Sequence, residues 1–400
     1  MKTTIIRICD KLIELCFYIL LVAVTFSTSI VEIASTTMIV VWVIKKLADR
    51  DLKAADSVPV RILLAYFVWV ILSCINSDYP RESFRGIFKV AEYGMLFIIS
   101  SCELRRGECA RRTLYVIAVS AAVICLDGIY QYFFGVDLIR GRRLIDLDYL
   151  HRISSSFVHP NSFGVYLSVV SMVLAGFVLS RAEKLKNKLK ILPAAILSIT
   201  CLVLTRSRGS WAGFAAALPV WGALRSKKRA VILAVLVIVA SAAVVIVLVT
   251  GMFNVDEYSG GTVWERMRLW QGTIDMIKVH PVLGFGVNTY SKNFPAYKPA
   301  DYPNMMYSHN CYLQMASETG IVGVALFILF LVSVFIYSLS GMYGIPPGMK
   351  KDVFSGLYAG LVGFSLSSIV DTHLYSLSLA VFFYLLLGLC FSLSFHGKGE

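Results

Sequence analysis

The sequence predicts an all-α polytopic membrane protein with about 12 transmembrane helices and one large outer loop. Only 16% of its 400 residues are charged, compared with roughly 25% in soluble domains, and 57% are hydrophobic. Apolar runs of about 20 residues, long enough to cross a bilayer core of ~30 Å, recur along the chain. Because a chain in lipid must satisfy its own backbone hydrogen bonds, we expect these runs to be helices.

The expected spans follow one another with short connectors, and only the connector after the ninth is long. The first apolar run, 12–26, is long enough to stay in the membrane, and no small-x-small cleavage site clearly follows it, so we expect no cleavable signal peptide. The 12 spans are expected at about 12–26, 29–45, 58–76, 87–102, 113–133, 161–180, 190–205, 209–224, 230–251, 319–340, 353–371 and 375–395.

The connectors alternate in charge, and this alternation predicts the orientation of the chain. One set is rich in lysine and paired arginine, including Lys45-Lys46, Lys184 to Lys190, and Lys350-Lys351, whereas the other set has almost no lysine before Lys278. Positively charged connectors stay in the cytoplasm. We therefore expect both termini in the cytoplasm and residues 134–160 and 252–318 on the outer side, which is the periplasm of a Gram-negative inner membrane.

Three regions are expected along the chain. Residues 1–251 supply nine spans, residues 252–318 form a periplasmic loop with short helices that carry the active site, and residues 319–400 supply the last three spans. Within the loop, residues 263–279 are predicted to form a helix that His280-Pro281 ends. Its apolar residues at helical spacing are Trp264, Met267, Trp270, Ile274 and Ile277.

Composition also excludes several classes of function. The net charge of +13 is explained by cytoplasmic anchoring of lysine and arginine, and no basic-aromatic module for nucleic acid is present. The nine cysteines show no CxxC or Cys/His spacing, so no metal site and no cofactor are expected.

Several arginines on the outer side are candidates for binding an anionic group. Arg206 and Arg208 lie in a very short link between two spans, and Arg266 lies in the predicted loop helix. A guanidinium group matches phosphate oxygens in a bidentate way and is always charged. The alternative is that these side chains only extend to the membrane interface.

A further basic segment occurs earlier on the outer side, and it contains Arg140, Arg142, Arg143 and Arg152. We interpret it as a patch for an anionic lipid or a phosphorylated glycan, with simple headgroup contact as the alternative.

His309 is the candidate for moving a proton. It follows Ser308, which we expect to be the N-cap of a helix, and it precedes Asn310. A histidine near the positive end of a helix dipole is favoured in its neutral form, which accepts a proton. The alternative is a surface histidine in a polar loop. His280 is expected to be structural because it precedes a proline.

These residues resemble a known family. The chain is similar to the O-antigen ligases, the Wzy/WaaL-like membrane glycosyltransferases, over most of its length. The resemblance includes the 12-span plan with one late periplasmic loop. The motifs that carry it are Arg152-x-Ser-x-Ser-Phe-x-His-Pro-Asn161, Ser207-Arg208-Gly209, His280-Pro281-x-x-Gly284-x-Gly286, and His309-Asn310 followed after nine residues by Gly320-x-x-Gly323.

The resemblance implies a specific reaction. Such ligases transfer O-antigen polysaccharide from undecaprenyl pyrophosphate to a sugar hydroxyl of lipid A–core, without a metal and with inversion. By position, His309 would be the general base, and Arg208 and Arg266 would hold the pyrophosphate. Arg206, Arg152 and Asn310 complete the predicted substrate-binding set, and membrane lipids are expected partners.

Three alternative functions remain. An O-antigen polymerase would use the same donor with a second lipid-linked glycan, and a protein O-oligosaccharyltransferase would use a protein acceptor. A transporter or flippase is disfavoured because no related halves or broken midplane helices are evident.

Overall fold

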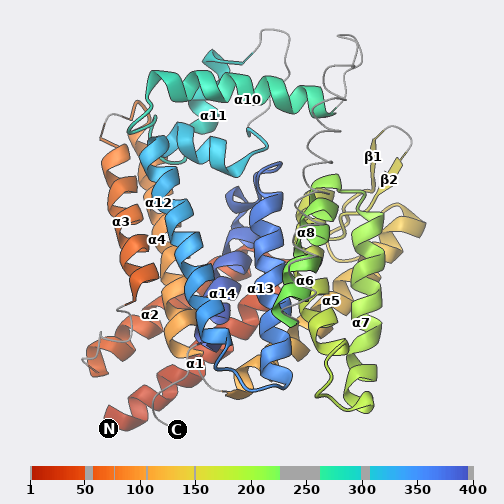
Figure 1. Cartoon of the computed structure of the whole chain (residues 1–400). Helices are drawn as coiled ribbons and strands as arrows, with labels where there is room; N and C mark the ends of the chain where they lie inside the picture. The colour runs from red at the N-terminus through yellow and green to blue at the C-terminus, as the bar shows by residue number, and fades with distance from the viewer. Residues whose placement is uncertain are drawn as a thin grey trace.

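The protein is a bundle of long helices whose polar connectors gather at its two ends (Figure 1). The computed structural model describes residues 2–49, 57–75, 77–104, 107–147, 150–225, 262–298 and 307–394. The first helices are α1 (Lys2–Ala23), α2 (Thr28–Asp49), α3 (Val58–Ser73), α4 (Pro80–Glu103) and α5 (Gly107–Phe134). The next are α6 (Pro160–Val178), α7 (Leu185–Leu204), α8 (Arg208–Arg225) and α10 (Thr262–Val279). The last are α11 (Tyr290–Asn293), η2 (Phe294–Ala296), α12 (Cys311–Met342), α13 (Met349–Ser367), η3 (His373–Tyr375) and α14 (Leu377–Ser394).

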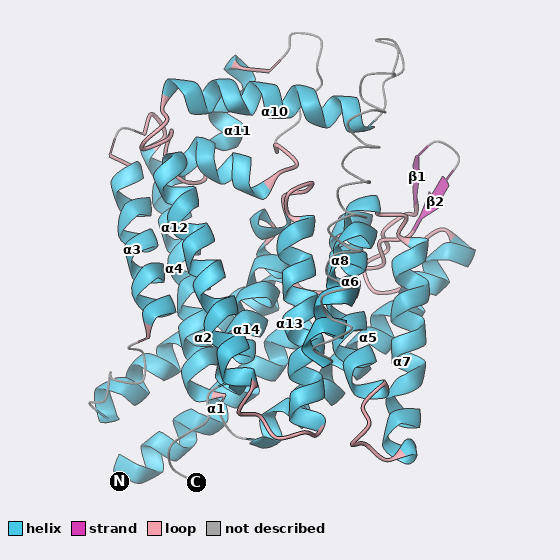
Figure 2. Cartoon of the chain, viewed as in Figure 1, coloured by secondary structure: helices cyan, strands magenta, loops and turns pink. Residues whose placement is uncertain are grey.

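Eleven of the 12 expected spans coincide with helices, and the ninth, 230–251, lies outside the described residues. Five helices in the described part of the chain have the length and apolar composition of a membrane span: α5 (from Cys109), α6, α7, α12 and α14. This supports a polytopic membrane protein, while the count of 12 spans stays a prediction. Among the described elements, helices dominate, and the strands are limited to one hairpin (Figure 2).

That hairpin was not expected from the sequence. Strand β1 (Ile145–Leu147) pairs antiparallel with β2 (Leu150–Arg152), with Ile145 opposite Arg152. It lies in the segment between α5 and α6. Because these strands contain three residues each, they carry too little alternating pattern to be recognised in a sequence.

Small residues let α13 pack closely between α6 and α8. A Cβ atom on Gly356 would lie 2.3 Å from the Met172 carbonyl oxygen of α6, and one on Gly363 would lie 2.4 Å from the Gly213 carbonyl oxygen of α8. Close backbone contact through glycine is a frequent way for helices to associate in lipid. It fixes the position of α13, whose outer end leads into the candidate site.

The helix α10 lies across one end of the bundle, above α3, α4 and α12 (Figure 1). Its observed bounds match the predicted helix at residues 263–279. The face of α10 packed against the protein carries Leu269 and Met276, whereas Ile274, one of the apolar residues at helical spacing, is exposed. Gly272 decides the docked face: a Cβ there would lie 2.8 Å from the Tyr297 carbonyl oxygen, so only glycine permits this approach.

Glycines of two sequence motifs, residues 280–286 and 309–323, join the segment after α10 to a break in α12. Gly320 has φ of 72° and ψ of 174°, which interrupts the helix that the sequence predicted to begin at 319. The amide of Ile321 donates to the Pro281 carbonyl at 2.8 Å, and the amide of Gly286 donates to the Glu318 carbonyl at 2.8 Å. Residues 280–286 therefore dock into the break, and α12 extends back to Cys311.

Candidate active site

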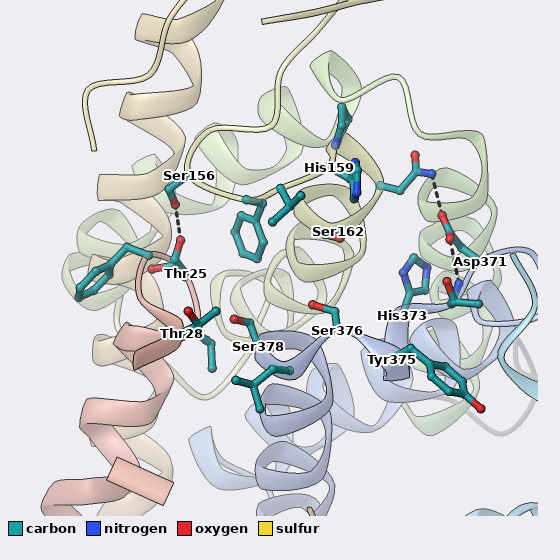
Figure 3. A pocket seen from close by; sticks show the side chains of 18 of the residues that line it. Thr25, Thr28, Ser156, His159, Ser162, Asp371, His373, Tyr375, Ser376 and Ser378 are labelled. Carbon is teal, nitrogen blue, oxygen red and sulfur yellow. Dashed lines mark hydrogen bonds between the residues drawn. The ribbon is translucent and has the colours of Figure 1, made fainter. Parts of the chain in front are cut away.

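A cavity of about 390 Å³ opens at the end of the bundle where α10 lies. Four connectors form it: the α1–α2 turn, the segment before α6, the residues before α12, and the α13–α14 connector. Figure 3 shows its lining side chains. The arginine, imidazole, carboxylate and amide groups among them are Arg140, Arg152, His159, Asn161, His309, Asp371 and His373.

His309 is paired with Asp371 in this cavity. The His309 Nδ1 atom lies 3.1 Å from Asp371 Oδ1, and the two side chains are 29% and 14% exposed. The backbone amide of Thr372 also donates to Asp371 Oδ1 at 2.8 Å. When the neutral ring carries its proton on Nδ1 and donates it to Asp371, the Nε2 atom is free to accept a proton from another molecule.

The start of α12 holds His309 in place. The N-cap is Asn310, not Ser308 as the sequence predicted: the Asn310 Oδ1 atom accepts from the amides of Tyr312 and Leu313, each at 3.0 Å. Ser308 instead accepts from the Asn310 amide at 3.1 Å. His309 adopts a left-handed φ of 52° between them. The Asn310 oxygen is thus used by the helix, and the role of Asn310 in binding substrate stays a prediction.

A second chain of contacts reaches Asp371 from the segment before α6. Asn161 donates from Nδ2 to Asp371 Oδ2 at 2.6 Å, and its own Oδ1 accepts from Arg152 Nη2 at 2.8 Å. Arg152 also donates from Nε to the Thr205 carbonyl at 3.1 Å. These bonds fix which end of the Asn161 amide faces Asp371. Pro160 at the first turn of α6 and the extended His159 before it place Asn161 at the cavity.

Positive charge gathers around the His309–Asp371 pair. Burial lowers the pKa of Arg152, and the neighbouring charges of Arg266 and Arg208 lower it further. The three arginines come from β2, α8 and α10, so the tertiary structure brings together three of the predicted site residues. Arg208 is the first residue of α8 and is exposed.

Asp371 stays ionised in this environment. Burial opposes its charge, but the hydrogen bond from His309 and the neighbouring His373, His309 and Arg266 hold the pKa of the carboxyl well below its usual range. Burial lowers the pKa values of His159 and His373. The site therefore combines one carboxylate, three imidazoles and several arginines.

Arg206 is placed differently from Arg208. It has a left-handed φ of 49° in the turn before α8, and its side chain is half-buried. It is not among the charges that act on Arg152, whereas Arg208 is. The charge of Arg208 thus acts together with those of Arg152 and Arg266, and the choice between Arg206 and Arg208 as a phosphate contact stays a prediction.

The sequence did not identify Asp371 as a partner of His309. It lies 62 positions from that residue. A signal was present, because Asp371-Thr372-His373 interrupts two apolar runs with a carboxylate and an imidazole. Such residues near spans are expensive and often functional. For metals, the described residues contain no group of three or more His, Cys, Asp or Glu side chains suited to an ion.

Residues 193–328 match the family model Wzy_C, whose description is O-antigen ligase. These residues form an O-antigen ligase domain. A comparison with curated proteins gave no match. The O-antigen ligase domain contains Arg206, Arg208, Arg266 and His309, whereas Arg152 and Asp371 lie before and after it in the sequence. The cavity is therefore shared between the O-antigen ligase domain and the helices on either side of it.

Proposed function

We propose that this protein is an O-antigen ligase that transfers polysaccharide from undecaprenyl pyrophosphate to a sugar hydroxyl of lipid A–core. The observation that carries the proposal is the His309–Asp371 pair in a cavity beside Arg152, Arg208 and Arg266. A base and a set of fixed cations are what this transfer needs. The family match to an O-antigen ligase domain supports the same general activity.

In the proposed reaction, His309 Nε2 removes the proton from the acceptor hydroxyl as its oxygen forms a bond to the anomeric carbon of the donor. The bond from that carbon to the pyrophosphate oxygen breaks, and undecaprenyl pyrophosphate leaves. One displacement inverts the anomeric centre. Asp371 orients the ring and stabilises the positive charge that it gains.

The arginines stabilise the leaving group. Charge builds on the pyrophosphate oxygens as the bond breaks, and fixed cations in a shielded site offset this charge without reorganising. Arg208 and Arg266 are the proposed contacts, because Arg152 uses Nε and one terminal nitrogen on Thr205 and Asn161. Arg206 is the next candidate if Arg208 proves dispensable.

The proposed orientation places the cavity and α10 in the periplasm and both termini in the cytoplasm, in a bacterial inner membrane. The lysine-rich connectors after α6 and α12 lie at the opposite end of the bundle from α10 (Figure 1). The proposed functional regions are residues 1–251, 252–318 and 319–400. A cysteine at the exposed Lys292, in a variant without native cysteines, should react with a membrane-impermeant probe in whole cells, and one at the exposed Lys186 should not. The reverse pattern would overturn the orientation.

Deletion of the gene, followed by glycolipid analysis, distinguishes the ligase from its relatives. Lipid-linked O-antigen that accumulates beside bare lipid A–core indicates a ligase. Core that carries a single repeat unit indicates a polymerase, and loss of glycan from a protein indicates an oligosaccharyltransferase. Purified wild-type protein should transfer glycan in EDTA, and His309→Gln should lose ~10²–10⁴-fold in rate. A requirement for added metal would contradict the proposed metal-independent mechanism.

A further inference from the structure

The cavity has two ends of different chemistry. Figure 3 shows Asp371, His373 and Tyr375 on one side, and Thr25, Thr28, Ser156 and Ser378 on the other. The first end lies beside the arginines proposed to hold the donor pyrophosphate. The second end is lined by hydroxyl groups, and Arg140 also belongs to the lining. It has no role in the reaction as described so far.

Arg140 is held in the lining by fixed backbone. Its Nε atom donates to the Phe26 carbonyl of the α1–α2 turn at 2.7 Å, while the residue remains exposed. The backbone amide of Arg140 donates to Asp137 Oδ1 at 2.6 Å. One bond through Nε leaves the two terminal nitrogens of the guanidinium group, the pair that binds carboxylate or phosphate, without a partner among the described residues.

The carboxylates near Arg140 are already used. Asp137 accepts from the amides of Arg140 and Arg142, and Asp127 accepts from the amides of Leu138 and Ile139. Among the described lining residues, the carboxylate of the cavity is Asp371, which lies at the other end. An arginine in a cavity without a carboxylate partner is suited to an anionic ligand.

Lipid-facing side chains lie beside this end of the cavity. Phe133 and Phe134, at the end of α5, and Leu138 and Ile139, next to Arg140, are large apolar residues that are exposed, with Leu138 at 67%. In a membrane protein such a strip faces acyl chains at the interface. A ligand that reaches Arg140 from this side would therefore be anchored in lipid.

We infer that the hydroxyl-lined end of the cavity is the acceptor subsite, and that Arg140 binds an anionic group on a lipid-anchored acceptor sugar. This inference rests on the proposed transfer reaction and adds to it the place where the acceptor binds and the residue that recognises its charge. The hydroxyl groups of Thr28 and Ser378 supply hydrogen bonds for sugar hydroxyls. Those of Thr25 and Ser156 donate to the Val22 and Thr25 carbonyls and keep only the capacity to accept. The cavity of about 390 Å³ encloses only the reacting end of a long glycan.

Transfer kinetics of the purified protein in nanodiscs test this assignment, with lipid A–core as acceptor in its native form and after enzymatic removal of its phosphates. Arg140→Gln should raise the acceptor KM about tenfold, the effect of one lost charge-assisted hydrogen bond, and should leave kcat and the donor KM unchanged. The KM difference between wild type and variant should disappear with the dephosphorylated acceptor. Arg140→Lys should retain most of the preference for phosphate because it keeps the charge.

Arg85→Gln is the matched control, since it removes an exposed arginine of α4 that does not line the cavity and belongs to no proposed binding site. It should change neither KM. A rise in donor KM for Arg140→Gln, or the same loss with both acceptors, would overturn the assignment, as would no change at all. Binding of the two acceptors to His309→Gln protein is measured in parallel. If this protein binds the phosphorylated acceptor more tightly and the preference depends on Arg140, the acceptor subsite is supported. Absence of transfer by the wild-type protein would then contradict the proposed function but not the subsite.

Discussion

Replacing Asp371 with asparagine tests the central contact of the site. The variant keeps nearly the same shape but removes the negative charge 3.1 Å from His309 Nδ1. The native carboxylate accepts hydrogen bonds on both of its oxygens, from Asn161 Nδ2 and from the backbone N–H of Thr372. The asparagine side chain has only one oxygen to offer these two donors. An asparagine oxygen cannot serve both sides. If its amino group faces His309, the ring protonates on Nε2 and can no longer accept a proton there.

The expected loss of rate follows from the geometry. Two unit charges 3.1 Å apart interact by about 5 kcal/mol at an effective dielectric constant of ~20. Solvent screens part of this energy because the His309 side chain is 29% exposed, and the ring is only partly protonated in the transition state. We expect a loss of roughly 2–4 kcal/mol in transition-state stabilisation, which corresponds to a rate about 30-fold to 10³-fold lower.

The assay is in-vitro transfer at saturating donor and acceptor, with thermal unfolding as a check on folding. A double-mutant cycle with His309→Gln separates a positioning role from a structural one. If Asp371 acts through His309, the second substitution should cost little once His309 is absent. Additive losses, or a wild-type rate for Asp371→Asn, would refute the proposed pairing.

Three further predictions follow from the described contacts. Arg208→Lys and Arg266→Lys should each lower the transfer rate roughly 10²-fold, because a point charge lacks the planar fork; near-normal rates in well-folded protein would move the pyrophosphate site elsewhere. Gly320→Ala should strongly destabilise the protein, because φ is 72° and the new Cβ would lie 1.8 Å from a backbone oxygen. Gly135→Ala is the comparison: its φ is 77° but the space around it is open, so the free energy of unfolding, measured by thermal denaturation, should fall by only ~1–2 kcal/mol. Burial lowers the pKa of His373 from 6.5, so near and below that pH the unfolded chain binds more protons than the folded one, and the stability of the fold falls as the pH decreases. His373→Gln should therefore reduce the drop in Tm between pH 7 and pH 5. An unchanged drop would exclude His373 as a source of this pH dependence.

Local sequence patterns were enough to predict the helices and several site residues. Apolar runs of span length predicted eleven of the described helices, because a chain in lipid has few ways to satisfy its backbone. Proline at 281 predicted the end of α10 correctly. Arg208, Arg266, Arg152 and His309 could be named as candidates because charged or titratable groups near the spans of a membrane protein are costly without a function.

Where a pattern allowed two outcomes, local reasoning failed. Ser308 and Asn310 are both good N-cap residues, and the contact between the Cys311 amide and the Ser368 carbonyl fixes the helix start at Cys311. The spacing of apolar residues in α10 predicted a helix but not which face docks, and Gly272 sets the face that approaches Tyr297. In both cases a contact with a distant segment decided between local alternatives of similar energy.

The partners of His309 were decided by tertiary structure alone. Asp371 lies 62 positions from His309, and Asn161 lies 210 positions from Asp371. Nothing local in the sequence relates these residues. They meet because α13 packs closely between α6 and α8 through glycine contacts, which bring the outer ends of α6, α12 and α13 to one cavity. The sequence determined which charged and titratable groups the connectors of this membrane protein carry, and the packing of its helices determined which of them lie together.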